Sequence, residues 1–330
     1  MNENKSFIDR QPLLLQFFIF LFLMLGCTSI FTYASFILIK PLFGIDGADL
    51  LLKKATENAD ALKENINEIN ALKFIQLLTS VGTFLVPSIL FGLAKNPGHD
   101  FLKLRSKTPL LFFFFSAAII FLSAPIINEV YEWNKNFDFN SFGSFGIEMK
   151  NAEKQNQLLT NIFLFMPSFQ DFMINILIVA VVPAVAEELF FRGVLQQLIK
   201  EASKSSHLAV WMTAVLFSAF HFDITGFIPR VLLGALLGYV FLWSGNLLVS
   251  MTGHFINNAA QVVLVYLFQT GNISYDASGD EPTPFYITVI FTLAMIATIY
   301  FFYKKRVMVK EEIPTTDSTI DSMMPPGENG

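Results

Sequence analysis

Apolar residues occur in long blocks along the chain, and shorter polar segments separate these blocks. A helix needs about 20 mostly apolar residues to cross the ~30 Å hydrocarbon core of a bilayer. The blocks therefore predict an all-α fold, a polytopic membrane helix bundle of about eight transmembrane helices. The expected spans are residues 13–39, 74–94, 109–128, 172–199, 207–223, 227–243, 246–269 and 284–303.

Three polar segments have patterns of their own. Residues 47–72 carry apolar residues at every third or fourth position, which predicts an outer amphipathic helix packed on the protein or lying at the membrane interface. Its apolar stripe is Leu51, Ala55, Ala59, Leu62, Ile66 and Ile69. Residues 129–170 are mixed and polar, so we expect an outer loop with short helical pieces. We expect residues 304–330 to form a disordered cytoplasmic tail.

The composition agrees with a membrane protein. Charged residues make up 15% of the chain, against about 25% in soluble globular domains. The single cysteine, Cys27, excludes an internal disulfide and a cysteine-based zinc site. No basic run is interleaved with aromatic residues, so we expect no nucleic acid as a partner. The expected surroundings of the protein are the lipid bilayer. The composition leaves the oligomeric state open.

Positive residues predict how the chain is oriented in the membrane. The short segment KNPGHDFLKLRSKTP, residues 95–109, is dense in lysine and arginine, and such segments stay on the cytoplasmic side. An even number of spans then places both termini in the cytoplasm. We therefore predict a multi-pass protein of the cell (plasma) membrane.

The segment AVAEELFFRGV, residues 184–194, places two carboxylates and a guanidinium inside the fourth span. Each costs roughly 2.5–3.5 kcal/mol at the centre of a bilayer. Glu188 and Arg192 are four residues apart and can pair on one helix face. Glu187 points about 100° away from Glu188 and is left over, so it marks a functional site by default. The alternative is a structural ion cluster of all three.

Two of the four histidines also fall in predicted spans. His221 ends the fifth span, and His254 lies in the seventh, with Asn258 one turn later. Either histidine alone is explained by a helix–helix hydrogen bond. Together with Glu187 they form a set that can activate water: a general base, an amide for an oxyanion, and donors for a catalytic metal. Nearby, Asp223 and Arg230 are expected to pair at the interface or to rim a cavity.

Three motifs in order resemble a known family. EELFFR at 187–192, FSAFH at 217–221 and HFINN at 254–258 are similar to the Glu-Glu-x-x-x-Arg, Phe-x-x-x-His and His-x-x-x-Asn motifs of the CAAX prenyl protease and bacteriocin-processing (type II CAAX, CPBP) intramembrane proteases. The resemblance covers roughly residues 170–265. It implies a CAAX-type endopeptidase with its active site inside the bundle.

The resemblance also divides the chain. Residues 171–270 become the catalytic core, preceded by the N-terminal transmembrane helices and outer segments in 1–170. Residues 271–303 hold the last transmembrane helix, and 304–330 the tail.

The family motifs imply a role for each matching residue. The implied water-activating pair is Glu187 and His221, the oxyanion or metal-side pair is His254 and Asn258, and the supporting pair is Glu188 and Arg192. Two mechanisms stay open. In one, Glu187, His221 and His254 hold zinc; in the other, a glutamate activates water without metal, since the His-x-x-x-His pair of common zinc proteases is missing.

We therefore expect an intramembrane endopeptidase that hydrolyses a peptide bond of a membrane-associated protein or peptide. The alternative is a proton-coupled transporter using the intramembrane Glu and His residues, which the lack of internal repeats disfavours. A non-catalytic scaffold predicts loss of a motif residue, whereas all are present. The sequence leaves open the side to which the cavity opens. The segment 47–72 is a hypothetical lid or docking surface for substrate.

Overall fold

The computed structural model describes residues 6–57, 59–95, 100–274 and 283–312, and this part is helical, without any strand. The elements are α1 (Leu13–Phe43), α2 (Ala48–Glu57), α3 (Ala59–Leu62), α4 (Ile66–Ser80), η1 (Val81–Leu85), α5 (Val86–Lys95), α6 (Leu110–Lys135), η2 (Phe139–Phe142), α7 (Ser144–Phe163), α8 (Phe169–Asn175), η3 (Ile176–Val181), α9 (Val182–Glu188), η4 (Leu189–Leu195), α10 (Gln196–Ser203), α11 (Ser206–Ala219), α12 (Phe227–Ser244), α13 (Leu247–Gln269) and α14 (Phe285–Glu312).

Seven of the described helices are long and apolar enough to cross a membrane. They confirm the predicted polytopic helix bundle. The span expected at 207–223 is shorter than predicted, because α11 ends at Ala219 after 14 residues. Its length falls below the usual requirement for a full crossing.

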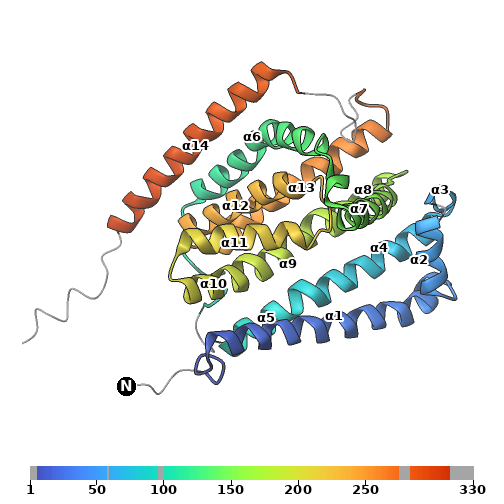
Figure 1. Cartoon of the computed structure of the whole chain (residues 1–330), viewed down its shortest axis with the longest axis horizontal. Coiled ribbons are helices and arrows are strands. Elements are labelled where there is room, and N and C mark those ends of the chain that lie inside the picture. The colour runs from blue at the N-terminus through green and yellow to red at the C-terminus, as the bar shows by residue number, and fades with distance from the viewer. Residues whose placement is uncertain (1–5, 58, 96–99, 275–282, 313–330) are drawn as a thin grey trace, which may run out of the picture.

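The helices lie side by side, and the first and last ones lie on opposite flanks of the bundle (Figure 1). α1 packs along α4 and α5, whereas α14 packs mainly on α6. The N-terminal end of α1 and the C-terminal end of α14 lie at the same end of the bundle (Figure 1). This arrangement agrees with termini on one side of the membrane; the cytoplasmic assignment of that side stays a prediction.

The fourth span is one continuous helical run from Phe169 to Ser203. Ser168 caps its start by accepting a hydrogen bond from the Asp171 amide. Pro183 has no N–H to donate to the preceding turn, and the π-helical segment η3 ends two residues before it, at Val181. A second π-helical segment, η4, follows Glu188. Such widened turns are frequent at functional sites.

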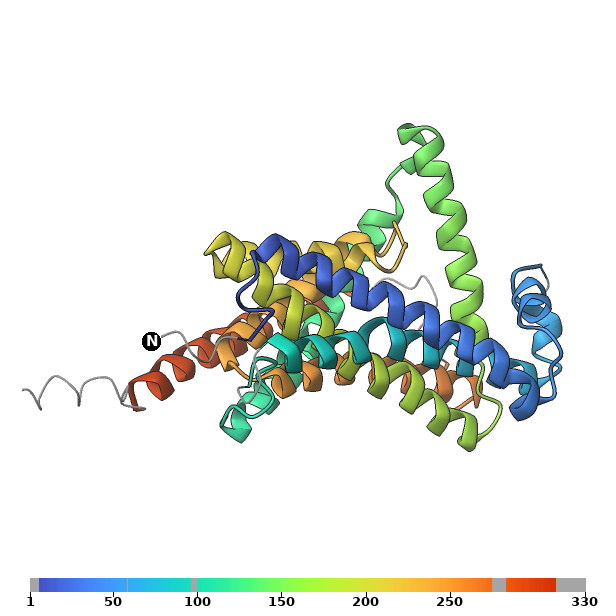
Figure 2. The same ribbon diagram turned by 90° about the horizontal axis from the view of Figure 1, so that it is seen from below.

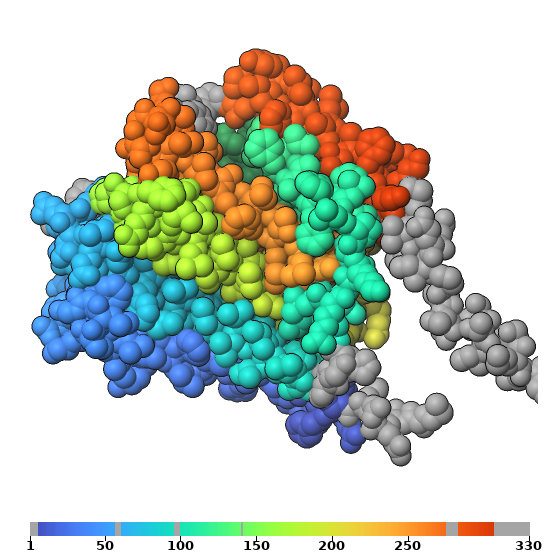
Figure 3. All heavy atoms as spheres, turned by 180° about the vertical axis from the view of Figure 1, so that it is seen from behind, coloured from blue at the N-terminus to red at the C-terminus, as the bar shows by residue number. Residues whose placement is uncertain are grey.

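Aromatic residues join the N-terminal helices to this run. Phe190 and Phe191 are buried, and their rings contact Phe20 of α1 and Phe84 of η1. Figure 3 shows the blue and cyan N-terminal helices packed against the yellow-green residues of the fourth span. The N-terminal third therefore supports the segment that carries the first motif.

The single amphipathic helix predicted at 47–72 is wrong. Helix α3 ends at Leu62, and α4 begins at Ile66 after Asn65 caps it. The stripe itself is buried in the protein: Leu51, Ala55, Leu62 and Ile69 are at most 4% exposed. The apolar positions were recognised, but a polar cap at Asn65 starts a new helix in the middle of the segment.

The loop predicted at 129–170 is also wrong. α6 continues to Lys135, and α7 is a helix of 20 residues. Figure 2 shows α7 standing across the direction of the bundle helices. The expected tail is helical as far as Glu312, and its remainder lies outside the described residues.

Candidate active site

Glu188 and Arg192 form a buried ion pair, as their spacing predicts. Arg192 Nη1 lies 2.5 Å from Glu188 Oε1, and both side chains are 0% exposed. Arg192 Nη2 donates to the Gly234 carbonyl of α12 at 2.8 Å, and the guanidinium lies 4.8 Å from the centre of the Phe217 ring. A buried charge is tolerated when it is paired; of the guanidinium nitrogens, Nε has no hydrogen-bond partner among the described residues.

Helix α13 supplies two further donors to the same carboxylate. Ser250 Oγ donates to Glu188 Oε2 at 2.5 Å, and His254 Nδ1 lies 2.9 Å from Glu188 Oε1. Glu188 is therefore anchored by Arg192 on its own helix and by two residues of α13. Sequence reasoning missed Ser250. The spacing of the residues could have identified it, because Ser250, His254 and Asn258 follow one another at four-residue intervals on one helix face.

Glu187 lies on the other side of this histidine. His254 Nε2 is 3.9 Å from Glu187 Oε2. Glu187 keeps 14% of its side chain exposed, whereas Glu188 keeps none. The two adjacent carboxylates thus differ as the helix geometry predicts: one is enclosed by donors, and the other is open to a cavity.

The four predicted catalytic residues line one cavity of about 760 Å³. We name it the glutamate cavity after Glu187; His221, His254 and Asn258 complete the set. These residues come from α9, from the turn after α11 and from α13. Glu188 and Arg192 do not line it and lie behind it.

His221 sits in the turn after α11, beyond its last helical residue. Its Nδ1 donates to the Phe217 carbonyl at 2.8 Å, which leaves Nε2 as the acceptor of the neutral ring. Asp223 and Arg230 pair at 2.7 Å, and both line the glutamate cavity. The pairing and the position at the cavity are therefore observed, whereas a position at the membrane interface stays a prediction.

Two asparagines hold the turn that carries His221. Asn134 of α6 donates to the carbonyls of Ile224 and Thr225 at 2.9 and 2.6 Å. Asn156 of α7 donates to the carbonyls of His221 and Phe222 at 3.1 and 3.2 Å. These contacts join segments 65 to 91 residues apart in the chain. No local pattern in the sequence indicates them.

Asn258 contacts the π-helical segment before α9. Its Nδ2 donates to the Val179 carbonyl at 3.1 Å, and its Oδ1 accepts from Asn257 at 3.0 Å. An asparagine amide has two N–H donors. One of them is thus used to fix the side chain, and the other remains for a ligand in the cavity.

The predicted zinc ligands do not form a ready metal centre. Within the residues that the structure describes, no three His, Cys, Asp or Glu side chains are grouped so as to hold a metal ion. Glu187, His221 and His254 share a cavity, but the zinc prediction gains no support from their placement. We therefore assign no step to a metal.

The fold and the site define a class: a polytopic helical membrane protein in which a buried Glu–Arg–His cluster adjoins a cavity with polar groups in a largely apolar lining. Residues 169–260 match the family described as Type II CAAX prenyl endopeptidase Rce1-like. The matched segment contains all three motifs, so the resemblance predicted from them is confirmed there.

A bacterial protein is similar over part of its length. The uncharacterized protein YpbD of Bacillus subtilis (strain 168) is 37% identical over 89 residues, which are 26% of this chain and 42% of YpbD. The chain thus spans less than half of this relative. No solved structure matches the chain.

Proposed function

We propose that the protein is an intramembrane endopeptidase that cleaves a membrane-associated protein or peptide. The observation that carries this proposal is the meeting of Glu187, His221, His254 and Asn258 at one cavity of about 760 Å³. Membership of the matched segment in the Rce1-like family supports the same reaction class. The cavity is large enough for several residues of an extended peptide to enter.

The proposed reaction uses Glu187 as general base. Glu187 takes one proton from a water that His221 Nε2 orients as an acceptor. The resulting hydroxide attacks the scissile carbonyl carbon. When the C–N bond breaks, Glu187 returns the proton to the leaving amine, so that one water is consumed for each bond cleaved.

The oxyanion formed by this attack needs donors. The second N–H of Asn258 is one, because Val179 uses only the first. His254 is the other: its Nδ1 lies 2.9 Å from Glu188 Oε1, and its Nε2 lies on the side of Glu187, 3.9 Å from Glu187 Oε2. Donors fixed before the reaction stabilise such a charge without reorganisation.

The position of the glutamate cavity indicates the side from which substrate enters. Pro125 and Tyr131 line it from α6, and they lie 15 and 21 residues after the start of α6 at Leu110. At 1.5 Å per residue, they are about 23 and 32 Å along that helix. α6 starts at the end of the bundle where the termini lie (Figure 1). We therefore propose entry from the opposite end, which is the outer side if the termini are cytoplasmic.

Proteolysis by the purified protein in liposomes tests the reaction. Wild type, Glu187→Gln and the matched control Glu148→Gln are incubated with a peptide library. We expect Glu187→Gln to lose about 10²- to 10⁴-fold in rate, while Glu148→Gln, altered at an exposed position of α7, keeps wild-type activity. The proposal fails if wild type cleaves nothing but shows a proton-driven flux that needs Glu187, since that result identifies a transporter.

Sealed vesicles test the side of entry. Reporter fusions to the two termini establish the orientation, and a membrane-impermeant peptide is added to the outside. We expect cleavage in vesicles whose termini are inside. Cleavage only in vesicles of the reverse orientation contradicts outer entry and leaves the reaction itself intact.

A further inference from the structure

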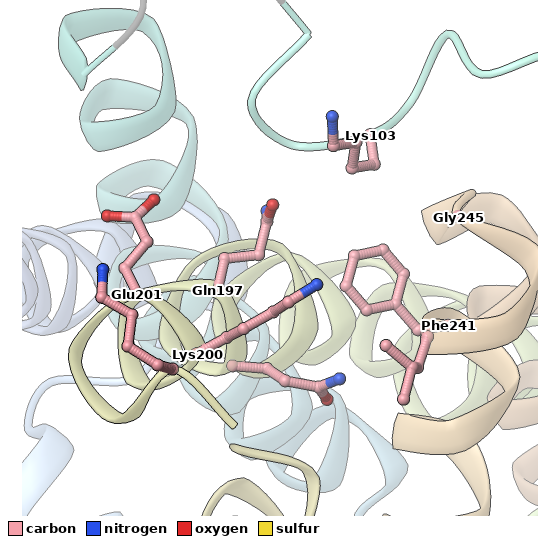
Figure 4. Close-up of a pocket in the computed structure, with 9 residues that line it drawn as sticks. Lys103, Gln197, Lys200, Glu201, Phe241 and Gly245 are labelled. Carbon is pink, nitrogen blue, oxygen red and sulfur yellow. The ribbon is translucent and has the colours of Figure 1, made fainter. Parts of the chain in front are cut away.

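A second cavity of about 470 Å³ lies at the other end of the bundle. α10, the segment after α5 and the C-terminal end of α12 form its walls (Figure 4). We name it the lysine cavity after Lys103, Lys200 and Lys204, which line it. This is the end at which α1 begins and α14 ends (Figure 1), and Lys103 belongs to the segment predicted to be cytoplasmic.

The lysine cavity has an excess of positive charge. Its one acid, Glu201, is already paired with the buried Lys95 at 2.5 Å. None of the three lining lysines has an ion pair or a side-chain hydrogen bond to another described residue. In Figure 4, Lys200 extends toward Phe241, and Lys103 stands on the opposite wall. Three uncompensated ammonium groups around one hollow favour an anion.

A buried acceptor in the same wall specifies the ligand further. Gln196 is 4% exposed and lines the lysine cavity. Its Nε2 donates to the Gly238 carbonyl at 3.2 Å, but its Oε1 has no hydrogen-bond partner. A buried acceptor without a partner is costly and rare. A ligand that brings an O–H or N–H donor beside its negative charge satisfies it.

We propose that the lysine cavity binds the head group of an anionic glycerophospholipid that carries a free hydroxyl, of which phosphatidylglycerol is the simplest. The phosphate meets the three lysines, and a hydroxyl donates to Gln196 Oε1. Phe241 and Leu242 supply an apolar wall. Basic pockets between transmembrane helices on the cytoplasmic side hold anionic head groups in this way.

The position of Gln196 links this site to the first motif. Arg192 and Gln196 are four residues apart and donate to Gly234 and Gly238, which are also four apart on α12. A head group that engages Gln196 therefore binds one turn from the buried ion pair. It holds the end of the motif-bearing helix against α12.

Lipid binding by the purified full-length protein tests the proposal without reference to proteolysis. Native mass spectrometry in detergent measures the affinity for phosphatidylglycerol, phosphatidic acid and phosphatidylcholine. We expect phosphatidylglycerol to bind most tightly, phosphatidic acid to bind without the hydroxyl contact, and zwitterionic phosphatidylcholine to bind least. Equal binding of all three overturns the proposal.

Two double variants separate a built site from general surface charge. Each lysine near an anionic surface contributes roughly a five-fold change in affinity, so Lys200→Ala with Lys204→Ala should weaken phosphatidylglycerol binding about 25-fold. The control, Arg105→Ala with Lys107→Ala, removes the same charge from two residues that follow Lys103 but do not line the cavity. Equal losses of phosphatidylglycerol affinity in both double variants overturn the proposed binding site. Thermal melting confirms that both are folded.

Gln196→Met tests the hydroxyl contact. It should abolish the preference for phosphatidylglycerol over phosphatidic acid and retain affinity for both, whereas an unchanged preference contradicts the assigned contact.

Glycerol 3-phosphate tests whether the ligand is a lipid or a free phosphate ester. If it binds as tightly as the lipid, the phosphate-ester site stands but the lipid assignment is overturned.

Discussion

The glutamate cavity and the lysine cavity differ in whether the protein itself supplies partners for the charged side chains beside them. Behind the first, Glu188 is enclosed by donors from Arg192, Ser250 and His254. Around the second, the side chains of Lys103, Lys200 and Lys204 have no ion pair or hydrogen bond with another described residue. The difference follows from how deep in the helix bundle each charged side chain lies. A charge within the apolar part of the bundle must be neutralised by the protein itself, whereas a charge at the membrane surface can be neutralised by water or lipid.

The largest effect on stability is expected from breaking the buried pair. Arg192→Met leaves Glu188 uncompensated, and removing one partner of a buried pair costs about 3–5 kcal/mol. Unfolding in a mixed-detergent titration measures the loss. The double variant Arg192→Met with Glu188→Gln should recover much of it, because no isolated charge remains. If the single variant is as stable as the double one, Glu188 is not held by charge pairing.

A smaller loss is expected at Ser250. Ser250→Ala removes one of the donors to Glu188, and an unmade buried hydrogen bond to a charged group costs about 1.5–3 kcal/mol. The same unfolding titration measures it. Ser244→Ala is a matched control, since Ser244 contacts only backbone carbonyls and an amide near the end of α12. An equal loss in both variants contradicts a special role for Ser250.

A third prediction concerns Asn156, which holds the turn that carries His221 at the glutamate cavity. Asn156→Ala removes two hydrogen bonds to that turn, each worth about 1 kcal/mol. We expect kcat to fall roughly five- to thirty-fold with little change in KM, because His221 is displaced while the cavity remains. The control is Asn151→Ala, an exposed residue of the same helix. A change confined to KM contradicts this positioning role.

The smallest effect is expected at the lysine cavity without added lipid. Lys200→Ala removes an exposed side chain with no partner, and such substitutions change stability by about 0.5 kcal/mol or less. With phosphatidylglycerol present, wild type should gain stability and the variant should gain less. Thermal melting with and without the lipid checks both statements. A large loss in the absence of lipid means that Lys200 has a structural role within the protein.

Much of the fold was predictable because membrane burial leaves a long apolar signature. The spans near 13–39 and 246–269 correspond closely to α1 and α13. Segments outside the membrane were less predictable. A polar sequence does not distinguish a surface loop from α7, whose helix is stabilised in part by packing against α2, α3 and α4. The cap at Asn65 likewise divides a segment with continuous apolar periodicity.

The sequence by itself determined the local chemistry. Four-residue spacing on one helix predicted the Glu188–Arg192 pair, and the 100° step between neighbours separated Glu187 from it. Only the tertiary structure decided which distant groups complete the site. Ser250 reaches Glu188 from 62 residues away, and Asn156 reaches the His221 turn from 65. Helix geometry relates residues a few positions apart, whereas contacts between helices depend on how whole helices pack, which no single segment encodes.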